Sequence, residues 1–230
     1  MPKTFYWRGV LVPFITPWSA EAAPSPPVVV RHGIGGTGLG YPDEDPRADR
    51  WNDALWARLP ATRGVGVPNF AGIHALRQRQ AMRRELCQVC GGPTFGTLPD
   101  ERTLYLLGAR DSDPIREGET TQAPPVHADC ARLAIRECPH LRRGWAAALV
   151  QYAPAWGVAG IPYDPKTLTA LPGPAGAPDG LVEVPYTDEA RMRWVLAARE
   201  IVRLHGVQAV TDLAALSEAC TTTHWRPSVH

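Results

Sequence analysis

Hydrophobic and polar positions change their spacing several times along the chain, and each change marks a predicted element. Residues 1–72 hold short apolar runs, from Val10 to Ile15 and from Val28 to Val30, that Pro and Gly interrupt repeatedly. Short apolar runs bounded by such residues are typical of strands and ordered loops. We therefore predict an irregular, β-containing N-terminal region with little helix.

Two segments in the middle of the chain show helical spacing. Residues 73–86 alternate apolar positions with an arginine-rich face, which predicts a helix that leads into a Cys-x-x-Cys motif. Residues 127–141 predict a second helix, with a proline near its end. Between them, residues 104–107 predict a strand, and we expect this strand to form a hairpin with the residues that follow Cys90.

The C-terminal part of the chain predicts further helices. Residues 144–163 carry no charge, which favours a buried helix followed by a strand, and residues 165–185 are rich in Pro and Gly, which indicates a linker or long loop. Residues 187–206 begin with Thr, Asp and Glu and continue with an apolar stripe, which predicts a long helix. A second short helix is predicted near Thr211.

Composition and charge narrow the classes of partner. The 230 residues have a formal net charge of +1, so no overall field attracts the chain to nucleic acid or to anionic lipid. The five cysteines are an odd number in a chain of this length, which argues against a disulfide framework and for a reducing, cytoplasmic compartment. Pro13 and Pro17 interrupt the N-terminal apolar run, so we expect no signal peptide. Gln151, Pro154 and Pro162 argue against a membrane span in residues 144–163.

Four residues have the spacing of a metal site. Cys87 and Cys90 form a C-x-x-C motif followed by two glycines, which permit the tight turn of a zinc knuckle. His127 and Cys130 are three positions apart at a predicted helix start, about 300° round the axis and ~4.5 Å along it, so both can face one ion. We predict a structural Zn²⁺, because three thiolates and one imidazole complete a tetrahedral shell.

The other cysteines do not fit this site. Cys138 lies eight positions beyond Cys130, about 12 Å further along the helix, and we interpret it as a buried thiol. Cys220 stands alone in the C-terminal segment and predicts a free thiol. The alternative for the cluster is a chance C-x-x-C motif with an unrelated core His and Cys.

The order of knuckle, hairpin and helical ligand pair resembles a treble-clef zinc finger from about residue 86 to residue 141. The predicted fold is therefore α+β, with a strand and loop region (1–72), an arginine-rich helix plus treble-clef-like zinc lobe (73–144), and a C-terminal α/β region with a long helix (145–230). Treble clefs include the HNH nucleases, so the resemblance implies an HNH-like nuclease as the alternative function. Those enzymes need histidines around a second, open metal, and no histidine lies between Cys90 and His127. We therefore predict a protein without enzymatic activity.

The segments VPFITPWSAE, HALRQRQAMRRELCQVCG and CPHL resemble actinobacterial and actinophage proteins over about half of the chain. Small phage proteins of this kind include the recombination directionality factors, which bind serine integrases and switch them from integration to excision. The resemblance implies a protein partner, such as a DNA-bound integrase or regulator. A regulator that binds DNA directly is a further alternative. The residues predicted to contact the partner or nucleic acid are Arg77, Arg79, Arg84, Arg132 and Arg136.

Overall fold

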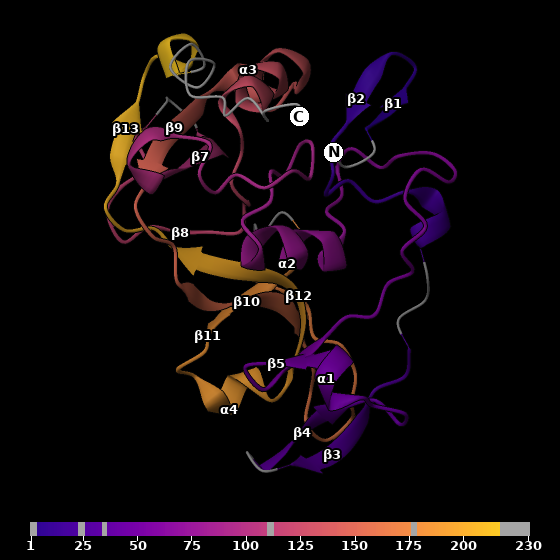
Figure 1. Ribbon diagram of the computed structural model, residues 1–230. Coiled ribbons are helices and arrows are strands. Elements are labelled where there is room, and N and C mark those ends of the chain that lie inside the picture. The colour runs from indigo at the N-terminus through magenta and orange to yellow at the C-terminus, as the bar shows by residue number, and fades with distance from the viewer. Residues whose placement is uncertain (1–3, 23–25, 34–35, 110–112, 176–178, 217–230) are drawn as a thin grey trace, which may run out of the picture. The chain divides into compact units, whose positions relative to one another are not determined.

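The computed structural model describes residues 4–22, 26–33, 36–109, 113–175 and 179–216 (Figure 1). The chain divides into two compact units, and each is assembled from separated stretches of sequence. Unit 1 comprises Met1–Ile15, Gln80–Pro154 and Arg203–His230, and unit 2 comprises Thr16–Arg79 and Ala155–Val202. The chain therefore passes from one unit to the other several times.

Unit 1 is built on an antiparallel sheet with the strand order β13-β9-β7 (Figure 1). Its strands are β7 (Thr103–Gly108), β9 (Trp145–Val150) and β13 (Gln208–Val210). The unit also contains the hairpin β1 (Phe5–Trp7) and β2 (Val10–Val12), β8 (Thr120–Thr121), the helix α3 (Ala128–Glu137), and the 3-10 turns η2 (Pro99–Glu101) and η4 (Leu141–Arg143).

Strand alternation decides which side chains of β7 enter the core of unit 1. Leu104 and Leu106 are buried in a cluster that also contains Ala131 of α3 and Ala147 of β9. Successive side chains of a strand point to opposite faces of the sheet. Thr103 and Tyr105 are therefore on the other face of β7, away from this core.

Unit 2 contains a sheet whose strands follow the order β11-β10-β12-β6-β5. Neighbouring strands are antiparallel except β12 and β6, which are parallel. The strands are β5 (Arg50–Trp51), β6 (Ala54–Trp56), β10 (Ala155–Pro162), β11 (Val182–Pro185) and β12 (Val195–Arg203). A hairpin of β3 (Val29–Gly33) and β4 (Gly36–Gly40), the helices α1 (Pro46–Asp49) and α4 (Glu189–Met192), and the turn η1 (Ser19–Glu21) complete the unit.

The prediction of an α+β fold with a helical C-terminal region is wrong, because the described residues are rich in strand and their helices are few and short. A helix does begin after Asp188, whose side chain accepts a hydrogen bond from the N–H of Arg191, but α4 ends at Met192. The apolar residues that follow form the long strand β12. Residues 195–197 and 200–202 of β12 are buried as continuous runs, and the β-branched residues Ile201 and Val202 favour a strand in such a setting.

Residues 144–163 also differ from the prediction, since they form β9 and β10 instead of a helix followed by a strand. A short apolar run such as this one has no periodicity that separates a buried helix from a buried strand. Of the second C-terminal helix, residues 213–216 are helical and the rest lies outside the described part of the chain.

The two central helices and the strand between them were predicted correctly. The helix α2 (Ala75–Arg83) and the helix α3 lie inside the predicted ranges, and β7 covers residues 104–107. The predicted hairpin is wrong, because β7 pairs with β9, which follows α3, and not with the residues after Cys90. The segment predicted to form a treble-clef-like lobe therefore lacks the hairpin that this prediction required. None of the helices in the described ranges is long and apolar enough to cross a membrane.

Candidate metal centre

The Cys87–Cys90 turn is held by backbone hydrogen bonds. The N–H of Gly91 donates to the carbonyl of Cys87 at 2.7 Å, and the N–H of Cys87 donates to the carbonyl of Gly92 at 2.7 Å. Gly91 has φ +76°, in the left-handed region that favours glycine. The N–H of Gly92 also points to Sγ of Cys90 at 3.4 Å. These contacts direct both sulfur atoms to the same side of the turn.

The N-terminal segment covers this turn, which the sequence did not indicate. The N–H of Phe14 donates to the carbonyl of Val89 at 2.8 Å, and the N–H of Ile15 donates to the carbonyl of Gln88 at 3.3 Å. The Phe14 ring is so close to Gly91 that a Cβ there would lie 2.7 Å from a ring carbon. No motif in the sequence links these two segments, so only the fold reveals the contact.

The second pair of side chains comes from the start of α3. His127 is the N-cap residue, with φ −73° and ψ 152°, and Cys130 lies in the first turn of the helix. The imidazole is oriented by the Pro93 carbonyl, which lies 2.8 Å from Nε2. If Nε2–H donates to this carbonyl, Nδ1 is left unprotonated as a ligand atom, an arrangement common among metal-bound histidines.

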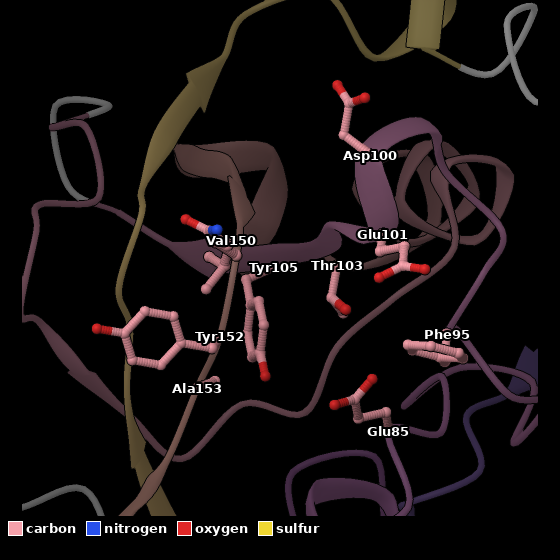
Figure 2. Close-up of a pocket in the computed structure, with 10 residues that line it drawn as sticks. Glu85, Phe95, Asp100, Glu101, Thr103, Tyr105, Val150, Tyr152 and Ala153 are labelled. Atoms are coloured by element: carbon pink, nitrogen blue, oxygen red, sulfur yellow. The ribbon is translucent and has the colours of Figure 1, made fainter.

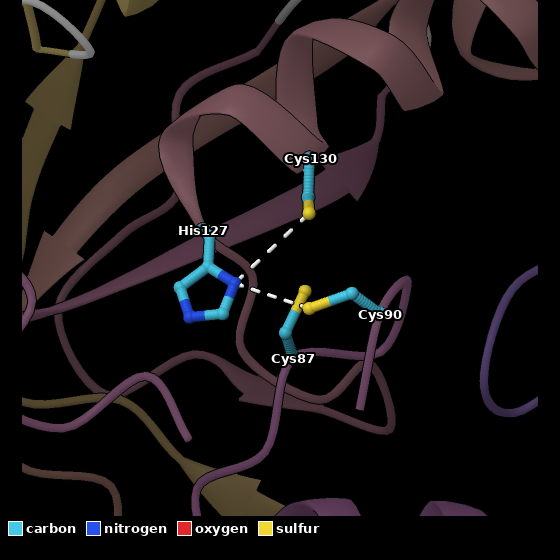
Figure 3. A group of neighbouring side chains, drawn as sticks. All are labelled: Cys87, Cys90, His127 and Cys130. Carbon is cyan, nitrogen blue, oxygen red and sulfur yellow. Dashed lines mark hydrogen bonds between the residues drawn. The ribbon is translucent and has the colours of Figure 1, made fainter. Parts of the chain in front are cut away.

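The four predicted side chains converge in space (Figure 3). One ligand atom from each of Cys87, Cys90, His127 and Cys130 lies within 4.8 Å of the others. Nδ1 of His127 lies 3.3 Å from Sγ of Cys90 and 4.0 Å from Sγ of Cys130. All of the cysteines in the described ranges are free thiols, so no disulfide competes for these sulfurs. The cluster can therefore hold a metal ion.

Hydrogen bonding within the cluster shifts the proton affinities of its members. Hydrogen bonds with Cys130 and Cys87 lower the pKa of Cys90, which favours its thiolate. Hydrogen bonds with Cys87 and Cys90 raise the pKa of His127 to about 11. Hydrogen bonds with Cys87 and Cys90 also raise the pKa of Cys130, which favours its neutral thiol. Without a metal the cluster is therefore held together by shared protons, and a metal ion can replace them.

The cysteine and histidine side chains of the cluster differ in how deeply they are buried. Cys87 is fully buried in the core of unit 1, and the other three ligands are partly buried. Cys138, predicted to be a buried thiol, is also only partly buried, at the C-cap of α3. Cys220 lies outside the described residues.

The predicted contact arginines occupy different environments. Arg77 is buried, and its guanidinium contacts the Glu21 carboxylate and the Thr16 carbonyl, so it does not lie on an exposed face of its unit. The guanidinium of Arg79 is 4.7 Å from the ring centroid of Trp56. The exposed members of the set are Arg84, Arg132 and Arg136.

No protein-family model, curated protein or solved structure matches this chain.

Proposed function

We propose that the Cys87, Cys90, His127 and Cys130 cluster binds one Zn²⁺. Zinc prefers thiolate and imidazole ligands in a tetrahedron, with bonds of about 2.3 Å to sulfur and about 2.0 Å to nitrogen. Such a tetrahedron has sulfur–nitrogen edges of roughly 3.5 Å. The separations of 3.3 and 4.0 Å between Nδ1 of His127 and the sulfurs of Cys90 and Cys130 lie on either side of that value.

The zinc is structural in this proposal. Four protein ligands complete the tetrahedron and leave no position for a water molecule or a substrate. The ion joins the knuckle to the first turn of α3, two elements that lie far apart in the sequence. Its binding free energy thereby becomes folding free energy for unit 1. The protein acts without catalysis, as a binding protein.

The binding surface that we propose is the exposed face of α3. Arg132 and Arg136 are exposed and one helical turn apart, so they share a face. Two further exposed arginines, Arg142 and Arg143, follow the helix, whereas the acidic residues Asp129 and Glu137 offset part of the charge. The observation that carries the proposal is that the metal-anchored helix also presents these arginines. Arginine suits carboxylate and phosphate groups alike.

The partner that we propose is a DNA-bound protein, for which a serine integrase on its attachment site is the candidate. The resemblance of the chain to actinophage proteins supports this choice. The low net charge supports a protein partner over DNA alone, because non-specific binding to DNA depends on a concentrated positive field.

Charge reversal tests the proposal. The double variant Arg132→Glu/Arg136→Glu should lose at least tenfold in affinity for the integrase–DNA complex, measured by electrophoretic mobility shift. Arg47→Glu is the matched control, because Arg47 is exposed on α1 in unit 2. Unchanged affinity in the double variant would refute this surface. If the protein binds DNA alone as tightly as it binds the integrase–DNA complex, and if that affinity falls steeply with salt, the protein binds DNA directly.

A further inference from the structure

Unit 1 contains a pocket of about 400 Å³ beside the face of β7 that points away from the core (Figure 2). Its walls come from β7, the end of β9, η2 and the residues on either side of the Cys87–Cys90 turn. The volume is in the range of small-molecule sites. We propose that this pocket binds a small organic cation, an amine or guanidinium compound that also offers hydrogen-bond donors.

Two acidic side chains face each other in the pocket. Figure 2 shows the carboxylates of Glu85 and Glu101 directed into the same space, next to the hydroxyls of Thr103 and Tyr105. Neither carboxylate has a hydrogen bond or an ion pair with another residue in the described ranges, and the lining contains no Lys, Arg or His. The pocket thus presents negative charge without a protein countercharge.

The hydroxyl groups of two buried residues favour the same class of ligand. Thr103 and Tyr105 are only 8% and 3% exposed, and they lie on the pocket face of β7. Neither hydroxyl has a hydrogen-bond partner within the part of the chain that the structure describes. Neither oxygen is among the fully enclosed polar atoms that lack a partner, so both hydroxyls are accessible from the pocket, where a ligand can bond to them. Burial, and then the nearby Glu85 carboxylate, raise the pKa of Tyr105, so its hydroxyl stays neutral.

The spacing of the acids favours an organic cation over a metal ion. A third acid, Asp100, also lines the pocket, but Figure 2 shows its carboxylate directed away from the other two. Glu85, Asp100 and Glu101 do not form a group of ligand atoms close enough for one ion, whereas the cysteine cluster does so among the described residues. Hard metal ions need six or more oxygen ligands in close array. An ammonium or guanidinium group can span separated carboxylates and hydroxyls through several N–H donors.

An exposed aromatic side chain provides the apolar part of the site. Phe95 is 63% exposed and lines the pocket beside the acids. An aromatic face attracts cations and covers the alkyl portion of an amine. The carboxylates of Glu85 and Glu101, the two hydroxyls described above and the Phe95 ring together suit a short alkyl chain that ends in a cationic group.

Calorimetric titration with agmatine tests the proposal, since agmatine carries both an ammonium and a guanidinium group. We expect saturable binding by the zinc-loaded protein, weakened at least tenfold in Glu85→Gln/Glu101→Gln and several-fold in Tyr105→Phe, which removes only the hydroxyl. Asp113→Asn is the matched control, because Asp113 is exposed in the same unit and does not line the pocket.

Three outcomes would overturn this assignment. They are no heat of binding with agmatine, agmatine binding that is equal in all variants, and binding of Mg²⁺ or Ca²⁺ without agmatine. Zinc content and circular dichroism of each variant show whether the fold is retained, and Tyr105→Phe keeps the test decisive if the double variant is unstable. The result is independent of the integrase proposal, because it involves none of the α3 arginines.

Discussion

Gly91 shows at the scale of one residue how the metal centre is supported. The residue has φ +76°, and a Cβ would lie 2.7 Å from a carbon of the Phe14 ring. A left-handed conformation costs a non-glycine residue roughly 1–2 kcal/mol. Gly91→Ala should therefore destabilise the protein by more than this amount and weaken metal binding, because Phe14 must move from the turn. Thermal unfolding and competition with a chelator measure the two effects.

Gly96→Ala is the control for this prediction. Gly96 has φ +69°, but a Cβ there meets no atom within 4 Å. Its substitution should cost only the backbone strain and leave metal affinity unchanged. Equal metal affinities for the two alanine variants and the wild type would contradict the role assigned to the Phe14 contact.

The clustering of the four metal-site candidates was predictable from the sequence, and their surroundings were not. C-x-x-C before two glycines and H-x-x-C at a helix start each fix the local geometry of two donors, so spacing alone identified all four. Arg77 misled the prediction because its helical position looked exposed, whereas its partner Glu21 lies far away in the sequence. Contacts between distant segments have no signature in local periodicity.

At the scale of elements, buried polar contacts hold the start of α2 within unit 2. Arg77 donates to Glu21 at 2.7 Å, and the side-chain amide of Gln78 exchanges two hydrogen bonds of 2.9 Å with the backbone of Glu200 in β12. Such contacts explain why a helix with few apolar residues is buried. Each of them fails if one partner is removed, because the other is left unsatisfied.

Glu21 makes the stability of this part of the fold depend on pH. Burial by itself would raise the pKa of Glu21, but hydrogen bonds from Arg77 and from the N–H of Trp18 outweigh it and hold the pKa below its usual value. A carboxyl with a lowered folded-state pKa stabilises the fold above its unfolded pKa of about 4.3. This contribution is lost as the pH falls through the lower folded value.

Glu21→Gln should therefore destabilise the protein at pH 7 by roughly 3 kcal/mol, since Arg77 would remain buried without its anion. The difference from wild type should shrink as the pH falls below about 4.3, where the wild-type carboxyl becomes protonated in the unfolded chain. Urea unfolding between pH 7 and pH 3 measures it. A constant difference over this range would show that the Glu21 charge contributes nothing.

The C-terminal half shows where element prediction failed. Residues 195–203 contain apolar side chains at positions that suit a helical stripe, but the strand β12 buries nearly all of them on both faces. A central strand has no alternation to distinguish it from a buried helix. The correct pairing, with β10 on one side and β6 on the other, depends on residues distant in the sequence.

At the scale of the whole molecule, the four cysteine and histidine side chains that could hold a metal ion all belong to unit 1. Removal of the metal should therefore destabilise mainly the folded structure of unit 1. We expect amides of β9 and α3 to lose protection from hydrogen exchange after chelation, while amides of β10 and β12 retain most of theirs. Mass spectrometry of peptides from both units measures this. Equal loss of protection in both units would contradict a stabilising role confined to unit 1.

Metal analysis of the purified protein shows whether the four side chains bind zinc. Elemental mass spectrometry should find one zinc per chain in the wild type and in Cys138→Ser, whose thiol lies outside the cluster. It should find little or none in Cys90→Ser, which removes one of the four ligands. A metal-free wild-type protein, or a zinc content that Cys90→Ser leaves intact, would show that these four side chains do not form a zinc site.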